Sequence, residues 1–345
     1  MKKLWFGLCA ITLLLTGCRS VSVLSFDVWR PAKITFPVEI ERVTVVNNSE
    51  DPDERIGNRY EDISNREYTL VVPHDSTSYR LAEYIAVALS DAHYFPEITI
   101  FYDDSITLPK SLYPLLSEFQ LATIRGGTDH TAVISLDKTD MAVTMKDNAF
   151  VGTSGETIFV TDLSVATTLH LRVYWPDKAL PSYEMVSDTV YWQSYGYTPD
   201  EAHESLPQSG EFVHEAMRRI SSNVRNTFIP HVESVTRYIY TSINPAMADA
   251  YDFWQQNKYK EASYLWEYVY EEQKNATTRA MAAANLAIYN ELFDKYGEAI
   301  AWVDKALSLL MEKADSDSGE IAILQDYRRQ LVERNTANPA LQQQM

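Results

Sequence analysis

Apolar and polar positions recur with two different periods along this chain. In the first two thirds, runs rich in β-branched residues predict strands, and runs with apolar residues three or four positions apart predict amphipathic helices. The strands are predicted at 38–47, 98–102, 131–136 and 235–240, and the helices at 79–92, 110–124 and 210–228. Strands and helices that follow one another in this way indicate a mixed α/β layer around a central sheet.

Two longer segments alternate between apolar and polar residues. From Leu163 to Trp175 every second residue is apolar or β-branched, and the segment from Tyr183 to Gln193 returns after a bend at 176–181 that contains two prolines. This pattern predicts an antiparallel hairpin at about 158–193, in a sheet with one solvated face.

Beyond Asn244 the strand patterns stop and a helical period continues. An offset of 37 residues aligns the segment Tyr259-Lys260-Glu261-Ala262 with Tyr296-Gly297-Glu298-Ala299. The repeated positions resemble tetratricopeptide repeats, although Ala250 and Asn290 replace the glycine and the aromatic residue typical of that family. This resemblance implies two helix-turn-helix units, at about 246–273 and 277–311, and a capping helix at about 319–333.

The predicted fold class is therefore α+β: a mixed α/β, sandwich-like N-terminal domain followed by an all-α domain of tetratricopeptide-like helical repeats. Four segments are predicted along the chain. They are a signal peptide at 1–17, the α/β domain with its long hairpin at 18–243, the repeats with the capping helix at 244–334, and a flexible tail at 335–345.

The start of the chain has the layout of a signal peptide. Two lysines precede an apolar run from Leu4 to Leu15, which is too short to span a bilayer, and two small residues stand before Cys18. The stretch 15–18 resembles the lipobox of bacterial lipoproteins. That resemblance implies cleavage before Cys18, attachment of acyl chains such as palmitate to Cys18, and a place in the cell envelope.

Charge and cysteine content limit the partners. The formal net charge of −18 argues against binding to nucleic acid and against adsorption on anionic lipid through basic patches. The cysteines are Cys9 and Cys18, of which the first would leave with the signal peptide and the second would carry lipid. The mature chain would then offer no thiol nucleophile and no thiolate metal site.

Motifs for catalysis or metal binding are missing from the sequence. None of the seven histidines has another histidine three or four positions away, and His203-Glu204 and His214-Glu215 are better explained as surface polar residues. The glycine-containing segment 152–157 lacks the lysine of a phosphate loop. We expect no catalytic residue, no metal and no cofactor besides the covalent lipid on Cys18. The alternative is a hydrolase whose catalytic carboxylates the sequence does not reveal.

Aromatic residues crowd the first predicted repeat. They are explained either by the repeat core and its docking on the preceding domain, or by an exposed surface that binds a peptide or a glycan. The candidate surface for a partner consists of Trp254, Tyr259, Tyr264, Trp266, Tyr268 and Tyr270.

The whole arrangement resembles an uncharacterised lipoprotein family of Bacteroides-type bacteria. The resemblance rests on the lipobox, Arg30-Pro31 before a strand that ends at Asn47-Asn48-Ser49, the segment 230–240, and the repeat tail. It implies no activity. Arg19 after the lipobox cysteine, where inner-membrane lipoproteins of enterobacteria carry Asp, favours the outer membrane and the periplasm.

We therefore predict a non-enzymatic, membrane-anchored envelope lipoprotein that binds or scaffolds another envelope protein through its repeat domain. One alternative is a lipoprotein that binds glycan or peptidoglycan. A weaker alternative is a subunit of an export or pore assembly built on the hairpin at 158–193, as in the curli-export family.

Overall fold

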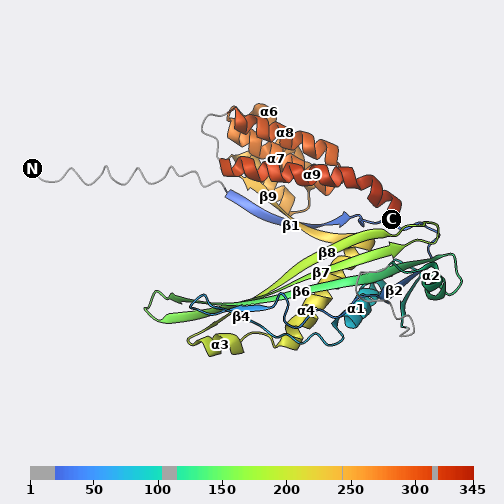
Figure 1. The fold of residues 1–345 in the computed structure, drawn as a ribbon. Helices are drawn as coiled ribbons and strands as arrows, with labels where there is room; N and C mark the ends of the chain where they lie inside the picture. Colours follow the sequence, from blue (N-terminus) through green and yellow to red (C-terminus); the bar gives the residue numbers. More distant parts are fainter. Residues whose placement is uncertain (1–19, 103–114, 243, 313–317) are drawn as a thin grey trace, which may run out of the picture. The chain divides into compact units, whose positions relative to one another are not determined.

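The computed structural model describes residues 20–102, 115–242, 244–312 and 318–345. It consists of two compact units (Figure 1). One unit contains Ala32–Pro230, and the other joins the N-terminal segment up to Pro31 to His231–Met345. Cys18 and the rest of the predicted signal peptide lie outside the described residues.

The unit at 32–230 is built on one seven-stranded sheet around the long strand β6. β2 pairs in parallel with the first part of β6, and β3 pairs in parallel with a later part, while β7 runs antiparallel along β6 from Val133 to Val151. The strands are β2 (Arg42–Asn47), β3 (Arg59–Glu61), β4 (Glu67–Thr69), β5 (Glu97–Phe101), β6 (Thr131–Val151), β7 (Thr157–Tyr174) and β8 (Ser182–Gly196). The predicted strand at 131–136 is thus only the start of a longer one.

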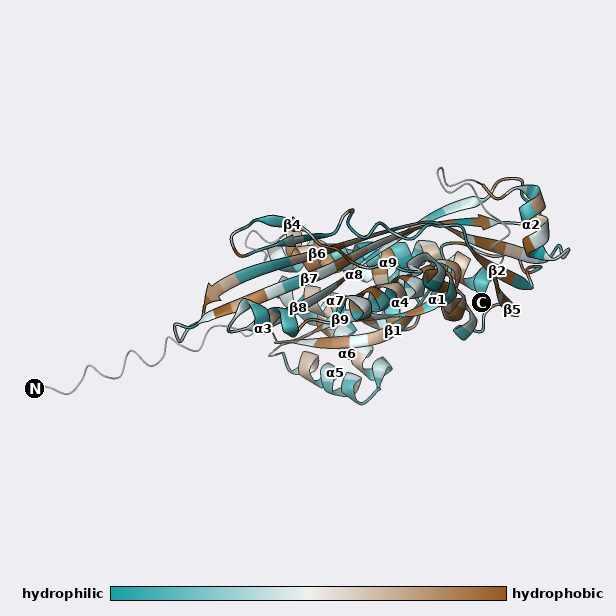
Figure 2. Cartoon of the chain, turned by 60° about the horizontal axis from the view of Figure 1, so that its bottom comes forward, coloured by the Kyte–Doolittle hydropathy of each residue, from teal (hydrophilic) through white to brown (hydrophobic). Residues whose placement is uncertain are grey.

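β7 and β8 pair antiparallel over the segment where the alternating pattern predicts a hairpin. Helices α1 (Thr77–Asp91) and α4 (Ser209–Phe228) cover one face of the sheet, and their apolar residues share its core. β2 is buried through most of its length, and Figure 2 shows the apolar character of β2 and β5. Two short helices complete the unit, α2 (Glu118–Arg125) and α3 (Pro199–Glu204).

The other unit combines a two-stranded ribbon with helical hairpins. β1 (Ser20–Arg30) pairs antiparallel with β9 (His231–Thr241) along the full length of both strands. Leu24 and Phe26 of β1 and Ile239 of β9 pack in the core of the helices. The helices are α5 (Pro245–Gln255), α6 (Tyr259–Glu272), α7 (Ala276–Leu292), α8 (Tyr296–Met311) and α9 (Ser318–Gln344).

The 37-residue offset appears in the turns of the two helical hairpins. Asn257 and Asp294 occupy the same position of the repeat, and both adopt the left-handed conformation, with φ of 60° and 57°. In each turn the side chain accepts a hydrogen bond from the tyrosine two residues later, Tyr259 or Tyr296. Asn and Asp tolerate this conformation better than other non-glycine residues, so the sequence selects the same turn twice. The fold is α+β followed by helical repeats.

Two predictions of domain organisation differ from the structure. The expected boundary at 243/244 assigned β9 to the α/β domain, but β9 pairs with β1 and contributes Ile239 to the helical core. The tail at 335–345 was expected to be flexible, but residues 335–344 form the last part of α9, and Leu341 there lines a hollow beside β1. Part of the predicted helix at 110–124 falls outside the described residues, and α2 starts after the capping residue Ser117.

Candidate functional site

The six aromatic residues predicted to form a partner surface do not lie on one surface. Trp254 and Trp266 are buried, with their ring centroids 5.3 Å apart between α5 and α6. Tyr259 packs edge-on against Trp254, with a centroid distance of 4.8 Å. The prediction is therefore wrong for the two tryptophans, because α6 packs against both α5 and α7 and uses these rings as core.

The remaining three tyrosines of the set are on α6. Tyr270 is half-buried and packs against Trp302, with Arg279 over its ring. Tyr264 and Tyr268 are 70% and 51% exposed. These two residues are four positions apart on one face of α6, and two exposed rings are ordinary for a protein surface and do not define a binding site.

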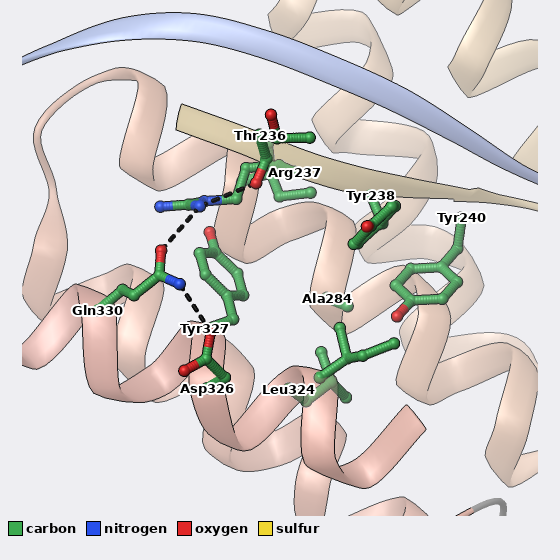
Figure 3. A pocket seen from close by; sticks show the side chains of 11 residues that line it. Thr236, Arg237, Tyr238, Tyr240, Ala284, Leu324, Asp326, Tyr327 and Gln330 are labelled. Carbon is green, nitrogen blue, oxygen red and sulfur yellow. Dashed lines mark hydrogen bonds between the residues drawn. The ribbon is translucent and has the colours of Figure 1, made fainter. Parts of the chain in front are cut away.

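A hollow of about 130 Å³ lies beside β9 instead (Figure 3). Its floor comes from α7 and its far wall from α9, so it belongs wholly to the helical unit. One end is apolar and the other carries polar side chains. The lining residues are Thr236, Arg237, Tyr238, Tyr240, Ala284, Ile288, Ile323, Leu324, Asp326, Tyr327 and Gln330.

Asn285 shows how β9 is held at this hollow. The backbone N–H of Tyr240 donates to Asn285 Oδ1 at 2.8 Å, and Asn285 Nδ2 donates to the Tyr240 carbonyl at 2.7 Å. The side chain of a helix residue thus replaces a neighbouring strand. Both backbone groups of Tyr240 therefore point away from β1, and the backbones of Tyr238 and Thr236 point the same way, because this direction alternates along an antiparallel strand.

The outer edge of β9 is capped on both sides of Tyr238. Asn285 holds Tyr240, and the Thr236 carbonyl accepts a hydrogen bond from Arg237 Nη1 at 2.9 Å. Within the part of the chain that the structure describes, nothing bonds the Tyr238 backbone on this edge. The backbone N–H and C=O of Tyr238 therefore face the hollow, next to its apolar side chains.

The polar end of the hollow is fixed by a buried charge cluster. Arg237 Nη1 also donates to Gln330 Oε1 at 3.0 Å, and Gln330 Nε2 donates to Asp326 at 2.7 Å (Figure 3). Behind them, Arg237 makes two hydrogen bonds of 2.8 and 2.7 Å to the carboxylate of Glu291, whose side chain is fully buried. This clamp holds the Arg237 guanidinium rigidly at the rim.

Glu291 accepts further hydrogen bonds. Tyr327 donates its hydroxyl at 2.8 Å, and Arg334 donates Nη1. Burial raises the pKa of the Tyr327 hydroxyl well above its ordinary value, and the carboxylate of Glu291 adds to this effect. Burial by itself would lower the pKa of Arg237, but the hydrogen bonds and charge of Glu291 raise it overall. The Arg237 guanidinium thus stays charged in the interior.

A second polar cluster lies in the unit at 32–230. The buried carboxylate of Asp147 accepts from Tyr60 at 2.5 Å and from Thr161 at 2.8 Å, and His203 Nε2 lies 2.7 Å from its Oδ1. Burial and the adjacent Asp147 raise the pKa of Tyr60. Among the described residues, no hydroxyl or thiol bonds to His203, so the cluster has no assembled nucleophile and base.

The histidine pairs weighed as metal ligands do not converge. His203 bonds Asp147 and not Glu204, and His214 lies 3.0 Å from Arg80 and 3.3 Å from Tyr84. In the described ranges no three His, Cys, Asp or Glu side chains are placed to hold a metal ion. None of the described helices is long and apolar enough to cross a membrane.

Sequence reasoning missed the residues that build the β9 hollow. Asn285 and Glu291 both lie on the buried side of α7, whose other residues there are mostly Ala, Leu and Ile. Polar residues on the apolar side of a helix are costly unless they are paired. The two polar residues on the apolar side of this helix could therefore have indicated the site from the sequence.

Comparison with known proteins gives a family. A family model described as a domain of unknown function (DUF8603) matches residues 40–240, more than half of the chain, and a second domain of unknown function (DUF6340) matches residues 248–333. No curated protein matches the chain.

Among solved structures, a neuraminyllactose-binding hemagglutinin homologue from Helicobacter pylori is 12% identical, with 56% of this chain and 84% of that chain covered and a TM-score of 0.24. A TM-score this low carries no argument about fold or function. The family match over residues 40–240 is the informative result, and by it the chain belongs to the DUF8603 family.

Proposed function

We propose that this protein is a non-enzymatic, lipid-anchored lipoprotein of the bacterial envelope that binds an extended segment of another envelope protein. The segment binds in the hollow between β9 and α9. The observation that carries the proposal is the open backbone edge at Tyr238 beside an apolar hollow. The anchor at Cys18, and the outer-membrane and periplasmic location, rest on the sequence at 15–19.

The hollow suits a short peptide strand. The Tyr238 N–H and C=O would each form one hydrogen bond with the backbone of the partner, as when a peptide extends a sheet edge. A volume of about 130 Å³ accommodates one apolar side chain of medium size, against Ala284, Ile288 and Leu324. Since Asn285 and Arg237 cap the edge on either side, the bound strand is limited to a few residues.

Site-specific photo-crosslinking in intact cells tests this binding. A photoreactive phenylalanine at position 238 is expected to give a protein adduct of defined mass, and the same group at Tyr264 is the matched control on an exposed ring. Ile323→Arg places a charge at the mouth of the hollow on a half-exposed residue, so it should abolish the adduct without unfolding the chain. An adduct from 238 that survives Ile323→Arg would reject the hollow as the binding site.

Metabolic labelling tests the anchor separately. Cells given an alkynyl palmitate are expected to label the wild-type protein and to leave Cys18→Ala unlabelled. The labelled protein should fractionate with the outer membrane. Label on the Cys18→Ala protein would contradict attachment at this cysteine, and label in the inner-membrane fraction would contradict the location.

Binding to a glycan is the second candidate, supported by a row of tyrosines on β8. Tyr183, Tyr191 and Tyr195 are 54%, 74% and 57% exposed, and their odd positions place them on one face of the strand. Exposed rings on one face can stack on sugar rings. Titration with peptidoglycan fragments, compared between wild type and Tyr191→Ala, tests this candidate.

The pore alternative loses its main support. The odd-numbered apolar residues of β7, such as Leu163, Val165 and Leu169, are buried in the core that α1 and α4 cover. The alternation at 158–193 is therefore explained by packing against helices. A lipid-facing strand is not needed to account for it.

A further inference from the structure

β8 forms one edge of the seven-stranded sheet, beside β7 (Figure 1). It pairs with β7 along its whole length, from Ser182 to Gly196, and no other strand of the described chain pairs with it. The register between the two strands is continuous, so no β-bulge twists this edge away. A long, regular edge of this kind presents a row of backbone donors and acceptors to which a further strand can pair.

The turn between β6 and β7 shows which backbone groups of β8 point outward. The N–H of Gly152 donates to the Glu156 carbonyl at 2.8 Å, so in this register the even-numbered residues of β7 bond to β6. The odd-numbered residues of β7 then bond to β8, where each of them faces an even-numbered residue. The backbone N–H and C=O of the odd-numbered residues from Tyr183 to Tyr195 therefore point away from β7. We call these residues the outer row of β8.

Almost all backbone groups of the outer row lack a partner. The N–H of Thr189 donates to Asp188 Oδ1 at 2.8 Å, which agrees with its outward direction. Among the described residues, no other hydrogen bond is made to the backbone of this row. The strand also contains none of the prolines and lysines with which natural proteins protect an edge. The edge is therefore open to pairing.

The charge of β8 favours a second copy of the chain as the partner. The formal net charge is −18, so two copies repel one another over most of their surfaces. The outer row has no charged side chain. The two charged residues of the strand are paired within the same unit, Glu184 with Lys33 and Asp188 with Arg219 at 2.8 Å. Two copies can therefore approach one another along β8 without this repulsion.

We infer that β8 pairs antiparallel with β8 of a second copy, across a two-fold axis at Thr189, so that the two sheets become one. An axis at this central residue pairs the whole outer row with itself. Tyr183 then lies opposite the partner's Tyr195, which places an aromatic cross-strand pair at each end of the interface. The Thr189 N–H would exchange Asp188 for the partner's Thr189 carbonyl. An axis at Val186 is disfavoured because it would set Glu184 opposite the partner's Asp188.

This edge is separate from the β9 hollow, and the inference does not depend on the proposed function. Charge exchange at the axis tests it in cells that express two differently tagged copies of the full-length protein. Thr189→Lys in both copies sets like charges opposite each other, and so does Thr189→Glu in both copies. Thr189→Lys in one copy and Thr189→Glu in the other sets opposite charges there. Thr189 is half-exposed, so both side chains can be accommodated.

Capture of one tagged copy with the other, after solubilisation in detergent, is the measurement. We expect wild-type copies to co-purify, capture to fall about five-fold or more in the two like-charged pairs, and capture to return in the oppositely charged pair. Thr157, an exposed threonine of β7 away from this edge, is the matched control, and the same substitutions there should leave capture unchanged. Circular dichroism confirms that each purified variant is folded.

Three outcomes would overturn the inference. Wild-type copies that do not co-purify would show that no such dimer forms. Like-charged pairs captured as well as the wild type would place the contact away from Thr189. An oppositely charged pair captured as poorly as the like-charged pairs would indicate that β8 contacts a different protein, because only contact between two copies brings the two substituted residues together.

Discussion

The side-chain amide of Asn285 hydrogen-bonds both backbone groups of Tyr240, and so one residue of α7 replaces a strand at the edge of β9. Asn285 is fully buried. Asn285→Ala would remove the hydrogen bonds that this amide makes to the buried N–H and C=O of Tyr240. We expect the free energy of unfolding to fall by about 2–4 kcal/mol, since each unpaired group costs roughly 1–3 kcal/mol. Urea unfolding followed by circular dichroism measures it.

Asn290→Ala is the matched control for this prediction, because it makes the same substitution on the same helix. Asn290 is also buried, but its amide donates only to the Leu286 carbonyl, within its own helix. Its loss should cost less than about 1 kcal/mol. Equal losses in the two variants would show that Asn285 does not hold β9.

Glu291→Gln should be among the most destabilising single substitutions in the helical unit. The carboxylate accepts hydrogen bonds from Arg237, Arg334 and Tyr327, all buried. A neutral amide leaves two buried guanidinium groups without a buried counter-charge, and we expect a loss of about 3–5 kcal/mol. Differential scanning calorimetry checks it. Retention of wild-type stability would mean that solvent reaches the cluster.

Stability should depend on pH through His74. Its side chain is 2% exposed, and neither ring nitrogen has a hydrogen-bond partner in the described chain. Burial lowers the pKa of His74 below its ordinary 6.5, and the charges of Asp51, Glu54 and Asp53 oppose this only in part. As the pH falls through 6.5, the His74 imidazole therefore takes up a proton in the unfolded chain at a higher pH than it does in the folded chain. The free energy of unfolding is therefore highest above that pH and decreases as the pH drops below it.

His74→Phe removes this proton uptake and should flatten the profile. We expect the wild type to lose up to about 1.4 kcal/mol per pH unit more than the variant below pH 6.5. Urea midpoints at several values between pH 5 and 7.5 give the slopes. His93→Asn changes an exposed histidine with φ of 52° and should keep the wild-type slope. Parallel profiles for wild type and His74→Phe would contradict the assignment.

Substitutions of the aromatic residues in the first helical hairpin should lower stability only where the side chain is buried. Trp266 is fully buried, and Trp266→Ala should cost about 3–5 kcal/mol. Tyr264 is 70% exposed on the same helix, and Tyr264→Ala should change stability by less than about 0.5 kcal/mol. Thermal unfolding of the two variants compares them, and a stable Trp266→Ala would place its ring outside the core.

The sequence predicted local elements better than their assembly. The alternation at 163–193 and the repeat offset both depend on neighbouring residues, and both correspond to observed elements. The pairing of β1 with β9 joins segments about 200 residues apart, and no local period encodes it. The β9 hollow depends on this pairing, so the sequence could not locate it. Of the two explanations for the crowded aromatics, the repeat core holds for Trp254 and Trp266, whereas the proposed partner surface does not include them.

Amide hydrogen exchange at Tyr238 distinguishes a partner strand bound in the β9 hollow from one bound elsewhere. Peptides selected from a random library on the full-length protein provide the partner strand. We expect that a selected peptide slows exchange of the Tyr238 amide, leaves the Asn285-bonded amide of Tyr240 unchanged, and loses affinity for Ile323→Arg. Protection that leaves Tyr238 unaffected and appears on α6 or in the unit at 32–230 would contradict it.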